Sequence, residues 1–400
     1  MKRSAALFAA LLYLCLACTD DDTPNDAVDT TLQDAVSHYA DLVYANYEDA
    51  HADAVALNET IDAFVASPSA AGLTEAKEAW LAARESYGQT EAFRFYGGPI
   101  DDEDGPEGQL NAWPLDESYI DYVNGTTSGD ETPDGTNIIN SPTEFPEITP
   151  EVIASLNENG SETNISSGYH AIEFLLWGQD LSVGPGGGER PYTDYVTDGS
   201  GTNDNQERRA TYLQAATQLV IDDLESLMDE WEAGSGAYRA TFTSEEEAEN
   251  SLSKIVSALG KLSKGELAGE RMFVAWDLRS KEDEHSCFSD NTHRDIVNNA
   301  LGIQNVYLGR YVRTDGSTLS GTSIYDVLAL EDADLAEEIK TLMEESVEAC
   351  EAIEAPFDQE FLAEPGRTRI QEAFTLLRTQ GDKLAEAANV LGFSFDPDDI

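Results

Sequence analysis

The sequence centres on Gly168-Tyr169-His170-Ala171-Ile172-Glu173, which opens the apolar helical run Phe174-Leu175-Leu176-Trp177. His170 and Glu173 are three residues apart, so on a helix they share one face. An imidazole and a carboxylate on one face can bind a single metal ion, and they can also simply hydrogen-bond each other in a first helical turn capped by Ser166 or Ser167. Gly168 permits close backbone approach at the helix start. The residues alone leave both interpretations open.

Amphipathic helices account for most of the chain around this motif. Apolar residues recur at helical spacing, and no segment shows the two-residue alternation of a half-buried strand. The pattern predicts an all-α fold made of two antiparallel helical-bundle halves joined by long ordered loops. The expected helices cover residues 31–66, 73–96, 150–157, 206–231, 244–279 (one or two helices), 293–311, 331–354 and 366–391.

Two long polar stretches interrupt the helices. Residues 97–147 are broken repeatedly by Gly-Pro and X-Pro pairs and contain the aromatic segment Trp113-Pro114-Leu115-Asp116. Loops of this length usually carry function or pack as ordered lids. Because residues 180–204 are also rich in glycine, we place the boundary between the halves there. The predicted halves are 31–203, with His170 and Glu173, and 204–400, with His285 and His293.

The N-terminus has the features of a targeting segment. Lys2 and Arg3 precede an apolar run that ends at Ala17 and is too short to span a bilayer. Leu16-Ala17-Cys18 resembles a bacterial lipoprotein processing site, with Cys15 at the position where leucine is usual. We therefore predict a signal peptide (1–17), lipidation of Cys18, an acidic tether (18–30), and a lipid-anchored location on the periplasmic face or outer surface of the outer membrane. An ordinary cleaved signal is the alternative.

The charge of the chain excludes one class of partner. A formal net charge of −55 opposes binding to nucleic acid. The 41% hydrophobic content still predicts a folded protein with an acidic surface. Such a surface, poor in lysine, suits a halophilic source, since ~1 M salt shortens the Debye length to about 3 Å. Acidic runs are therefore weak indicators of metal sites here. Cys287 and Cys350 form either a disulfide or two separate thiols.

A second polar motif runs from Glu284 to Asp295 and contains His285, Ser286, Asp290 and His293. Three of the chain's five histidines lie in this motif or the first one. Asp290 and His293 are close enough to share a ligand. Helix capping by Asp290, Asn291 or Thr292 is the alternative, although it leaves the two histidines unexplained. Ser286 is weak evidence for a nucleophile, because sequence neighbours such as His285 rarely have triad geometry.

A third segment places Glu91 and Arg94 on one helical face just before the long loop. An ordinary surface ion pair is the simpler interpretation of this spacing. In a cleft, Arg94 would instead balance carboxylates or hold an anionic chelate.

These segments, together with Trp113-Pro114-Leu115-Asp116, resemble the imelysin-like family of bacterial envelope proteins and its iron-regulated protein A branch. Residues 168–173 match that family's Gly-x-His-x-x-Glu signature, and residues 174–180 and 285–293 continue the likeness. The resemblance implies a cleft between two helical halves and a role in the uptake of iron or another metal. It also implies a metallopeptidase class. The chain has no His-Glu-x-x-His, however, and Phe174 stands where the inverted His-x-x-Glu-His motif needs histidine.

We therefore predict an envelope-anchored protein that binds a metal ion or metal complex, with a transporter as a possible partner. Mixed imidazole and carboxylate ligands suit iron, or zinc, better than copper(I). A metallopeptidase using His170 and Glu173 is the main alternative, and a structural lipoprotein is the third. The predicted metal ligands are His170, Glu173, Asp290 and His293. The predicted surrounding residues of the cleft are Glu91, Arg94, Trp113, Asp116, His285 and Ser286.

Overall fold

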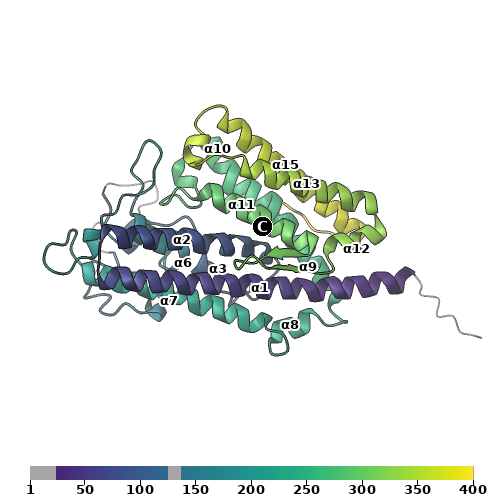
Figure 1. Ribbon diagram of the computed structural model, residues 1–400, viewed down its shortest axis with the longest axis horizontal. Coiled ribbons are helices and arrows are strands. Elements are labelled where there is room, and N and C mark those ends of the chain that lie inside the picture. Colours follow the sequence, from purple (N-terminus) through teal and green to yellow (C-terminus); the bar gives the residue numbers. More distant parts are fainter. Residues whose placement is uncertain (1–23, 125–136, 400) are drawn as a thin grey trace, which may run out of the picture.

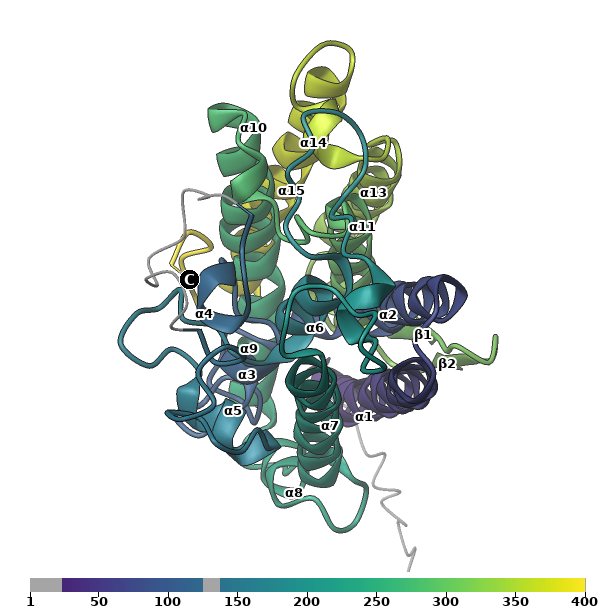
Figure 2. The same ribbon diagram turned by 90° about the vertical axis from the view of Figure 1, so that its left-hand side faces the viewer.

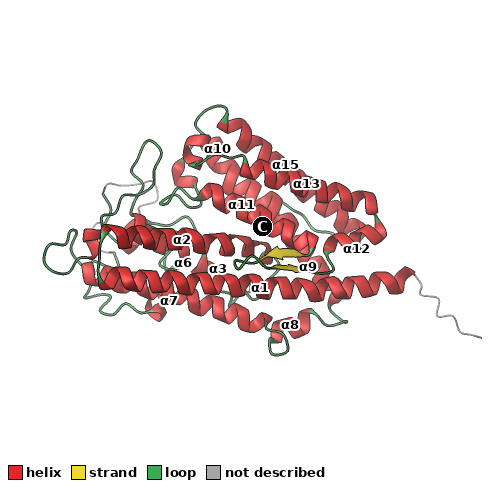
Figure 3. Cartoon of the chain, viewed as in Figure 1, coloured by secondary structure: helices red, strands yellow, loops and turns green. Residues whose placement is uncertain are grey.

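The computed structural model describes residues 24–124 and 137–399. Helices dominate it, so the predicted all-α fold is confirmed (Figure 3). Within the described ranges, β structure is limited to one short antiparallel pair, β1 (Arg310–Val312) and β2 (Thr318–Ser320). Strand β1 follows a helix, β2 follows β1 after a short turn, and the two form a small ribbon at the side of the molecule (Figure 2).

The first helical layer is built on three long helices, α1 (Pro24–Ala66), α2 (Ala70–Thr90) and α7 (Gln206–Trp231), the last of which follows the predicted boundary at residues 203 and 204. The link between α1 and α2 is short, so the two helices run antiparallel side by side (Figure 1). Ser69 caps α2 by accepting a hydrogen bond from the Gly72 N–H at 3.1 Å. The helix that carries the His170 motif, α6 (Gly168–Trp177), packs between α2 and α7.

The C-terminal half is a second helical layer. Its first helix consists of α9 (Ala248–Lys261), wider π-type turns, η3 (Leu262–Phe273), and α10 (Val274–Leu278). The three follow one another without a break, so the predicted helical stretch 244–279 holds one continuous helix. The remaining long helices of this layer are α11 (Thr292–Leu308), α13 (Ala333–Glu351) and α15 (Gly366–Val390). A shorter helix, α12 (Ile324–Glu331), leads into α13.

The two layers meet where α2 packs on α11. Glycines make this contact close, because a Cβ on Gly302 would lie 2.4 Å from the Gln89 carbonyl oxygen and one on Gly88 would lie 2.8 Å from Asn298 Cβ. A single cluster of buried apolar side chains continues from one layer to the other. The halves therefore share a core, and the division at residues 203 and 204 stays a prediction.

Short helices account for much of the remaining chain, and two of them, α3 and α4, lie in the stretch 97–147 that was predicted as a loop. The end view shows α3, α4 and α5 on the same side of α6, and α3 contacts α6, so part of the predicted loop packs against the helix that bears the motif (Figure 2). The short elements are η1 (Glu91–Phe93), α3 (Glu107–Leu110), α4 (Glu117–Ile120), α5 (Pro150–Leu156), η2 (Tyr192–Tyr195), α8 (Ala237–Phe242), η4 (Lys281–Asp283) and α14 (Phe357–Glu360).

The predicted signal peptide and the Cys18 lipidation site lie outside the described residues. Helix α1 begins at Pro24, earlier than the expected residue 31, so the tether predicted for residues 18–30 is helical in its second part. A proline suits the first turn of a helix, where its missing N–H costs nothing. Across residues 24–124 and 137–399, every helix is too short or too polar to cross a membrane. Cys287 and Cys350 are free thiols.

Candidate functional site

The backbone conformation and close packing at residue 168 explain why the motif begins with glycine. Its φ of +80° lies in the left-handed region, and a Cβ there would come within 2.5 Å of the Leu110 carbonyl oxygen. Ser167 occupies the N-cap position of α6, but its hydroxyl donates to the Gln109 carbonyl at 3.0 Å instead of capping the helix. Ser167 is therefore the N-cap residue, one of the two that were expected, but its side chain binds α3 and makes no capping hydrogen bond to α6.

His170 and Glu173 are both buried and hydrogen-bonded to each other, with His170 Nδ1 2.9 Å from Glu173 Oε2. The other carboxylate oxygen, Oε1, accepts bonds from the Ser289 N–H at 2.8 Å and from its hydroxyl at 2.7 Å. Burial raises the pKa of Glu173 to about 8, although the bonds from Ser289 oppose this shift. Burial, with the nearby Arg84 cation, lowers the pKa of His170 to about 3. His170 is therefore a neutral imidazole at physiological pH.

A second imidazole lies against the first. The rings of His285 and His170 meet edge to face with centroids 4.7 Å apart, and the His170 Nε2 atom is buried without a hydrogen-bond partner. His285 Nδ1 lies 3.3 Å from Asp295 Oδ2, and its Nε2 lies 3.5 Å from Asn111 Nδ2. Burial and the Arg271 cation lower the pKa of His285 to about 3. The site thus contains two adjacent neutral imidazoles.

Arg84 anchors this arrangement from α2. Its Nε and Nη2 donate to Asp295 Oδ1 at 3.2 and 3.0 Å, and its Nη1 donates to Asn111 Oδ1 at 2.7 Å. Asp295 also accepts a bond from the Ser286 hydroxyl. Burial opposes ionisation of Asp295, but the Arg84 cation outweighs it and holds the pKa of that carboxyl well below its usual range. Arg84 and Asp295 therefore form a buried ion pair that positions His285.

Glu91 is the centre of a second buried ionic group. Its Oε2 accepts from Arg94 Nη1 at 2.6 Å and from Arg271 Nη2 at 2.7 Å, and its Oε1 accepts from Asn111 Nδ2 at 3.1 Å. Arg94 also pairs with Glu107 at 2.9 Å. The Glu91 carboxylate is only 1% exposed, so the surface ion pair considered for Glu91 and Arg94 is excluded.

A cavity of about 380 Å³ opens above these groups. The indole of Trp113 meets the His285 ring edge to face at 5.9 Å, so both lie at the same part of the cavity wall. Because both halves contribute to the wall, the cavity is a cleft between them. It is lined by Arg94, Glu107, Asn111, Ala112, Trp113, Pro114, Glu158, Glu162, Glu266, Arg271 and His285.

The other predicted site residues take different contacts. Asp290 accepts a bond from the Gly186 N–H at 2.9 Å, and burial together with Asp358 raises its pKa to about 6. His293 is half-buried at the start of α11, where burial lowers its pKa. Asp116 is buried and accepts a bond from the Ser118 hydroxyl. The structure thus joins His170 and Glu173 to His285 and Ser289.

Sequence reasoning missed Arg84, Asn111, Arg271 and Asp295. One signal for Arg84 was present, since it lies at helical spacing from Trp80 and Tyr87 on an otherwise apolar face of α2. A charged residue on such a face requires a buried partner. Arg271 and Asp295 had no comparable local signal.

The carboxylates near the imidazoles already form hydrogen bonds or ion pairs with other side chains. Glu173 is bonded to Ser289, Asp295 to Arg84, and Glu91 to two arginines. In keeping with this, the described part of the chain contains no group of three or more His, Cys, Asp or Glu residues arranged to hold a metal ion. Of the ring nitrogens of His170 and His285, His170 Nε2 is buried without a hydrogen-bond partner, and His285 Nε2 has only the 3.5 Å contact with Asn111 Nδ2.

Comparison with known proteins places the chain in a family. The imelysin family model matches residues 43–384. Iron-regulated protein A of Synechococcus elongatus is 24% identical over 351 residues, covering 86% of this chain and 82% of that protein. A crystal structure titled as an iron-regulated protein A precursor from Parabacteroides distasonis superimposes with a TM-score of 0.67 at 18% identity, over 90% of this chain and 95% of that one. An imelysin-like protein from Psychrobacter arcticum gives 0.57 at 13% identity, over 92% and 97%. The chain belongs to the imelysin family.

Proposed function

We propose that this protein binds an iron-containing or related metal complex in the cleft between its two halves. The single observation that carries the proposal is a pair of adjacent imidazoles. His285 lines the cleft, and His170 lies directly against it with a buried Nε2 atom that has no partner. The name of the relative from Synechococcus elongatus, iron-regulated protein A, supports an iron-related role.

The hydrogen bonds of the two rings favour metal binding through Nε2. A ligating histidine usually donates its other ring N–H to a carboxylate, which fixes the tautomer. His170 Nδ1 faces Glu173 and His285 Nδ1 faces Asp295, so each ring has a carboxyl partner on its Nδ1 side. His170 Nε2 has no partner, and His285 Nε2 would exchange its contact with Asn111 Nδ2 for the metal. Imidazole nitrogen suits iron and zinc alike.

Two imidazoles leave a coordination shell incomplete. The nearby carboxylates are held by Ser289, Arg84, Arg94 and Arg271, so we propose that the remaining ligands arrive with the metal or come from solvent. The cavity of about 380 Å³ has room for a small chelate. Glu107, Glu158, Glu162 and Glu266 in its wall outnumber its two arginines, and this excess of negative charge favours a cation.

A metallopeptidase is the second candidate, and the geometry supports it less well. A catalytic zinc typically takes three protein ligands and a water that a general base can reach. Glu173 is bonded at both oxygens, so it is poorly placed to act as that base. Anchoring through Cys18, residence in the cell envelope, a transporter partner and a high-salt environment remain proposals from the sequence.

Equilibrium dialysis in concentrated salt tests the proposal, because exposed carboxylates then bind cations weakly. Protein purified without chelator would be loaded with ferric citrate, ferrous iron or zinc, and the bound metal measured by elemental analysis. We expect wild type to retain metal and His170→Ala and His285→Ala to lose most of it. His293→Ala is the matched control, since it removes the other histidine of the second motif, which lies at the start of α11 and has its own unpartnered buried nitrogen. Equal retention by all four proteins would refute the assignment.

A further inference from the structure

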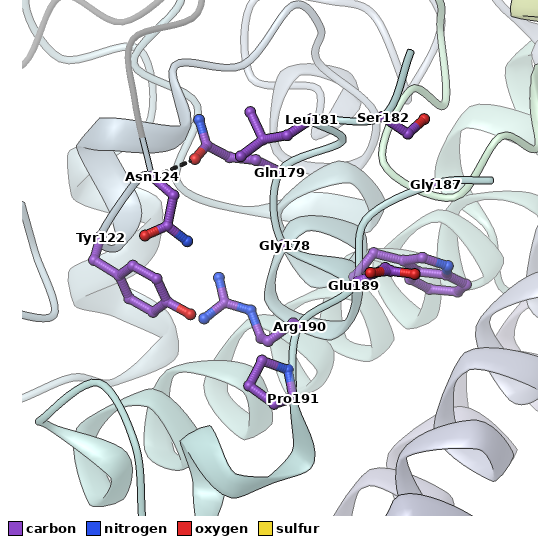
Figure 4. Close-up of a pocket in the computed structure, with 11 residues that line it drawn as sticks. Tyr122, Asn124, Gly178, Gln179, Leu181, Ser182, Gly187, Glu189, Arg190 and Pro191 are labelled. Carbon is purple, nitrogen blue, oxygen red and sulfur yellow. Dashed lines mark hydrogen bonds between the residues drawn. The ribbon is translucent and has the colours of Figure 1, made fainter. Parts of the chain in front are cut away.

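We propose that a second cavity, at the C-terminal end of α6, binds a small organic carboxylate. This cavity measures about 400 Å³ and shares no lining residue with the cleft (Figure 4). Its wall is formed by the end of α6, by the segment that runs from Leu181 to Pro191, and by Tyr122 and Asn124.

Arg190 is the first reason for the proposal. Its guanidinium is held rigidly, because Nη1 donates to Asp121 at 2.7 Å and the group stacks against the rings of Tyr122 and Phe174 at 5.1 and 5.2 Å. Arg190 is 5% exposed, yet its Nε is buried without a hydrogen-bond partner. A buried donor without an acceptor is costly to a fold, so an unpaired guanidinium N–H beside a cavity indicates an acceptor supplied from outside.

Gln179 is the second reason. Its Oε1 accepts a bond from the Asn124 N–H at 2.6 Å, which fixes the orientation of the amide group. Gln179 Nε2 is then the donor side, and it too is buried without a partner. Figure 4 shows the side chains of Arg190, Asn124 and Gln179 around the same space, although they come from different segments.

Two unpartnered donors in the wall of one cavity, one of them on a cation, favour a ligand with anionic acceptor oxygens, such as a carboxylate. Two aspartates lie beside Arg190, and both have other donors: Asp121 accepts from Arg209 at 2.6 and 2.9 Å, and Asp194 accepts from the Tyr122 hydroxyl at 2.5 Å. Glu189 is the carboxylate in the cavity wall that opposes an anion. Lys77 adds positive charge, with its ammonium 5.0 Å from the centre of the Trp177 ring that lines the cavity.

The other side chains of the cavity wall indicate what the non-carboxylate part of the ligand is like. Trp177, Leu181 and Pro191 offer apolar surface, and Leu181 is 53% exposed. A carboxylate attached to a small apolar or aromatic group would cover these side chains while its oxygens meet the two donors. The overall charge of −55 repels anions, so specific binding of one here would depend on these groups.

Calorimetric titration of metal-free full-length protein with benzoate tests the proposal, and benzamide is the neutral probe of the same shape. We expect saturable benzoate binding that is at least about tenfold tighter than benzamide binding, since a charge-assisted hydrogen bond is worth roughly that factor. Gln179→Glu keeps the oxygen that accepts from Asn124 and places a negative charge where the donor was. It should weaken benzoate binding by about tenfold or more. Gln218→Glu makes the same charge change at an exposed position of α7 and should not.

Arg190→Lys should also abolish benzoate binding if the variant folds, which circular dichroism would establish. Gln179 is only half-buried, so Gln179→Glu should fold. It therefore tests carboxylate binding even if Arg190→Lys unfolds. Absence of saturable benzoate binding, equal affinity for benzamide, or equal affinity in Gln179→Glu and Gln218→Glu would each overturn the proposal. Because the protein is metal-free, these outcomes are independent of the metal-binding function proposed for the cleft.

Discussion

The imidazole of His285 packs edge to face on the imidazole of His170, with ring centroids 4.7 Å apart and ring planes at 71°. The first ring belongs to the loop before α11 and the second to α6, so the contact joins the two polar motifs of the sequence. Ser289 strengthens the junction by donating twice to Glu173. The loop that carries His285 therefore holds the motif of one half against the other half.

We expect the purified protein to show no metal-dependent peptidase activity. The site offers two imidazoles, and its carboxylates are bonded to other groups, so it lacks the three ligands and free base of a catalytic zinc centre. The measurement is cleavage of an unfolded polypeptide with added zinc. Chelator-sensitive cleavage that Glu173→Ala abolishes would show that the second candidate function is the correct one.

Gly168→Ala should destabilise the protein clearly. A positive φ costs an alanine about 1–3 kcal/mol, and the clash of its Cβ with the Leu110 carbonyl at 2.5 Å adds to this. Denaturant unfolding measures the loss. Gly184→Ala is the control, because a Cβ there meets nothing within 4 Å, and its effect should stay within about 0.5 kcal/mol. Equal unfolding midpoints for the two variants would contradict this account of the motif's glycine.

Arg84→Met should lower the free energy of unfolding by about 3–5 kcal/mol, because it leaves Asp295 as a buried charge without its cation. Arg294→Met is the matched control. It breaks a pair with Glu85 that joins the same two helices at the surface, where 37% and 42% of the side chains are exposed, and should cost about 0–1 kcal/mol. Urea unfolding of both variants provides the comparison. Similar losses would mean that the buried pair contributes no more than the exposed one.

Asp223→Asn should stabilise the protein at neutral pH and not at acid pH. Burial, aided by Asp222, raises the pKa of Asp223 to about 7. An acid whose pKa is raised in the folded state stabilises that state below its unfolded pKa and loses this contribution as pH rises through the folded value. The gain in melting temperature should therefore grow between about pH 4 and pH 7. Asp229→Asn, at an exposed position of the same helix, is the control for removing one negative charge from α7; a parallel change in both variants would be evidence against a shifted Asp223.

The local spacing of apolar residues predicted much of the fold. The apolar spacing in residues 206–231 predicts α7 with the same bounds, because helix formation depends on side chains three and four residues apart. The Gly168 to Glu173 motif was readable for the same reason, since its two polar residues share a helical face wherever that helix packs. The sequence by itself therefore determined the helices, the acidic surface and the first metal candidate.

Only the tertiary structure decided which residues surround that candidate. Arg84, Asp295 and Arg271 come from α2, α11 and η3, and they meet because α2 packs on α11 at one particular register. The same packing put His285, rather than His293, against His170. Helical periodicity states which face of a helix is buried but not which residue of a distant helix lies opposite, because that depends on the depth at which glycines such as Gly302 let the two backbones approach.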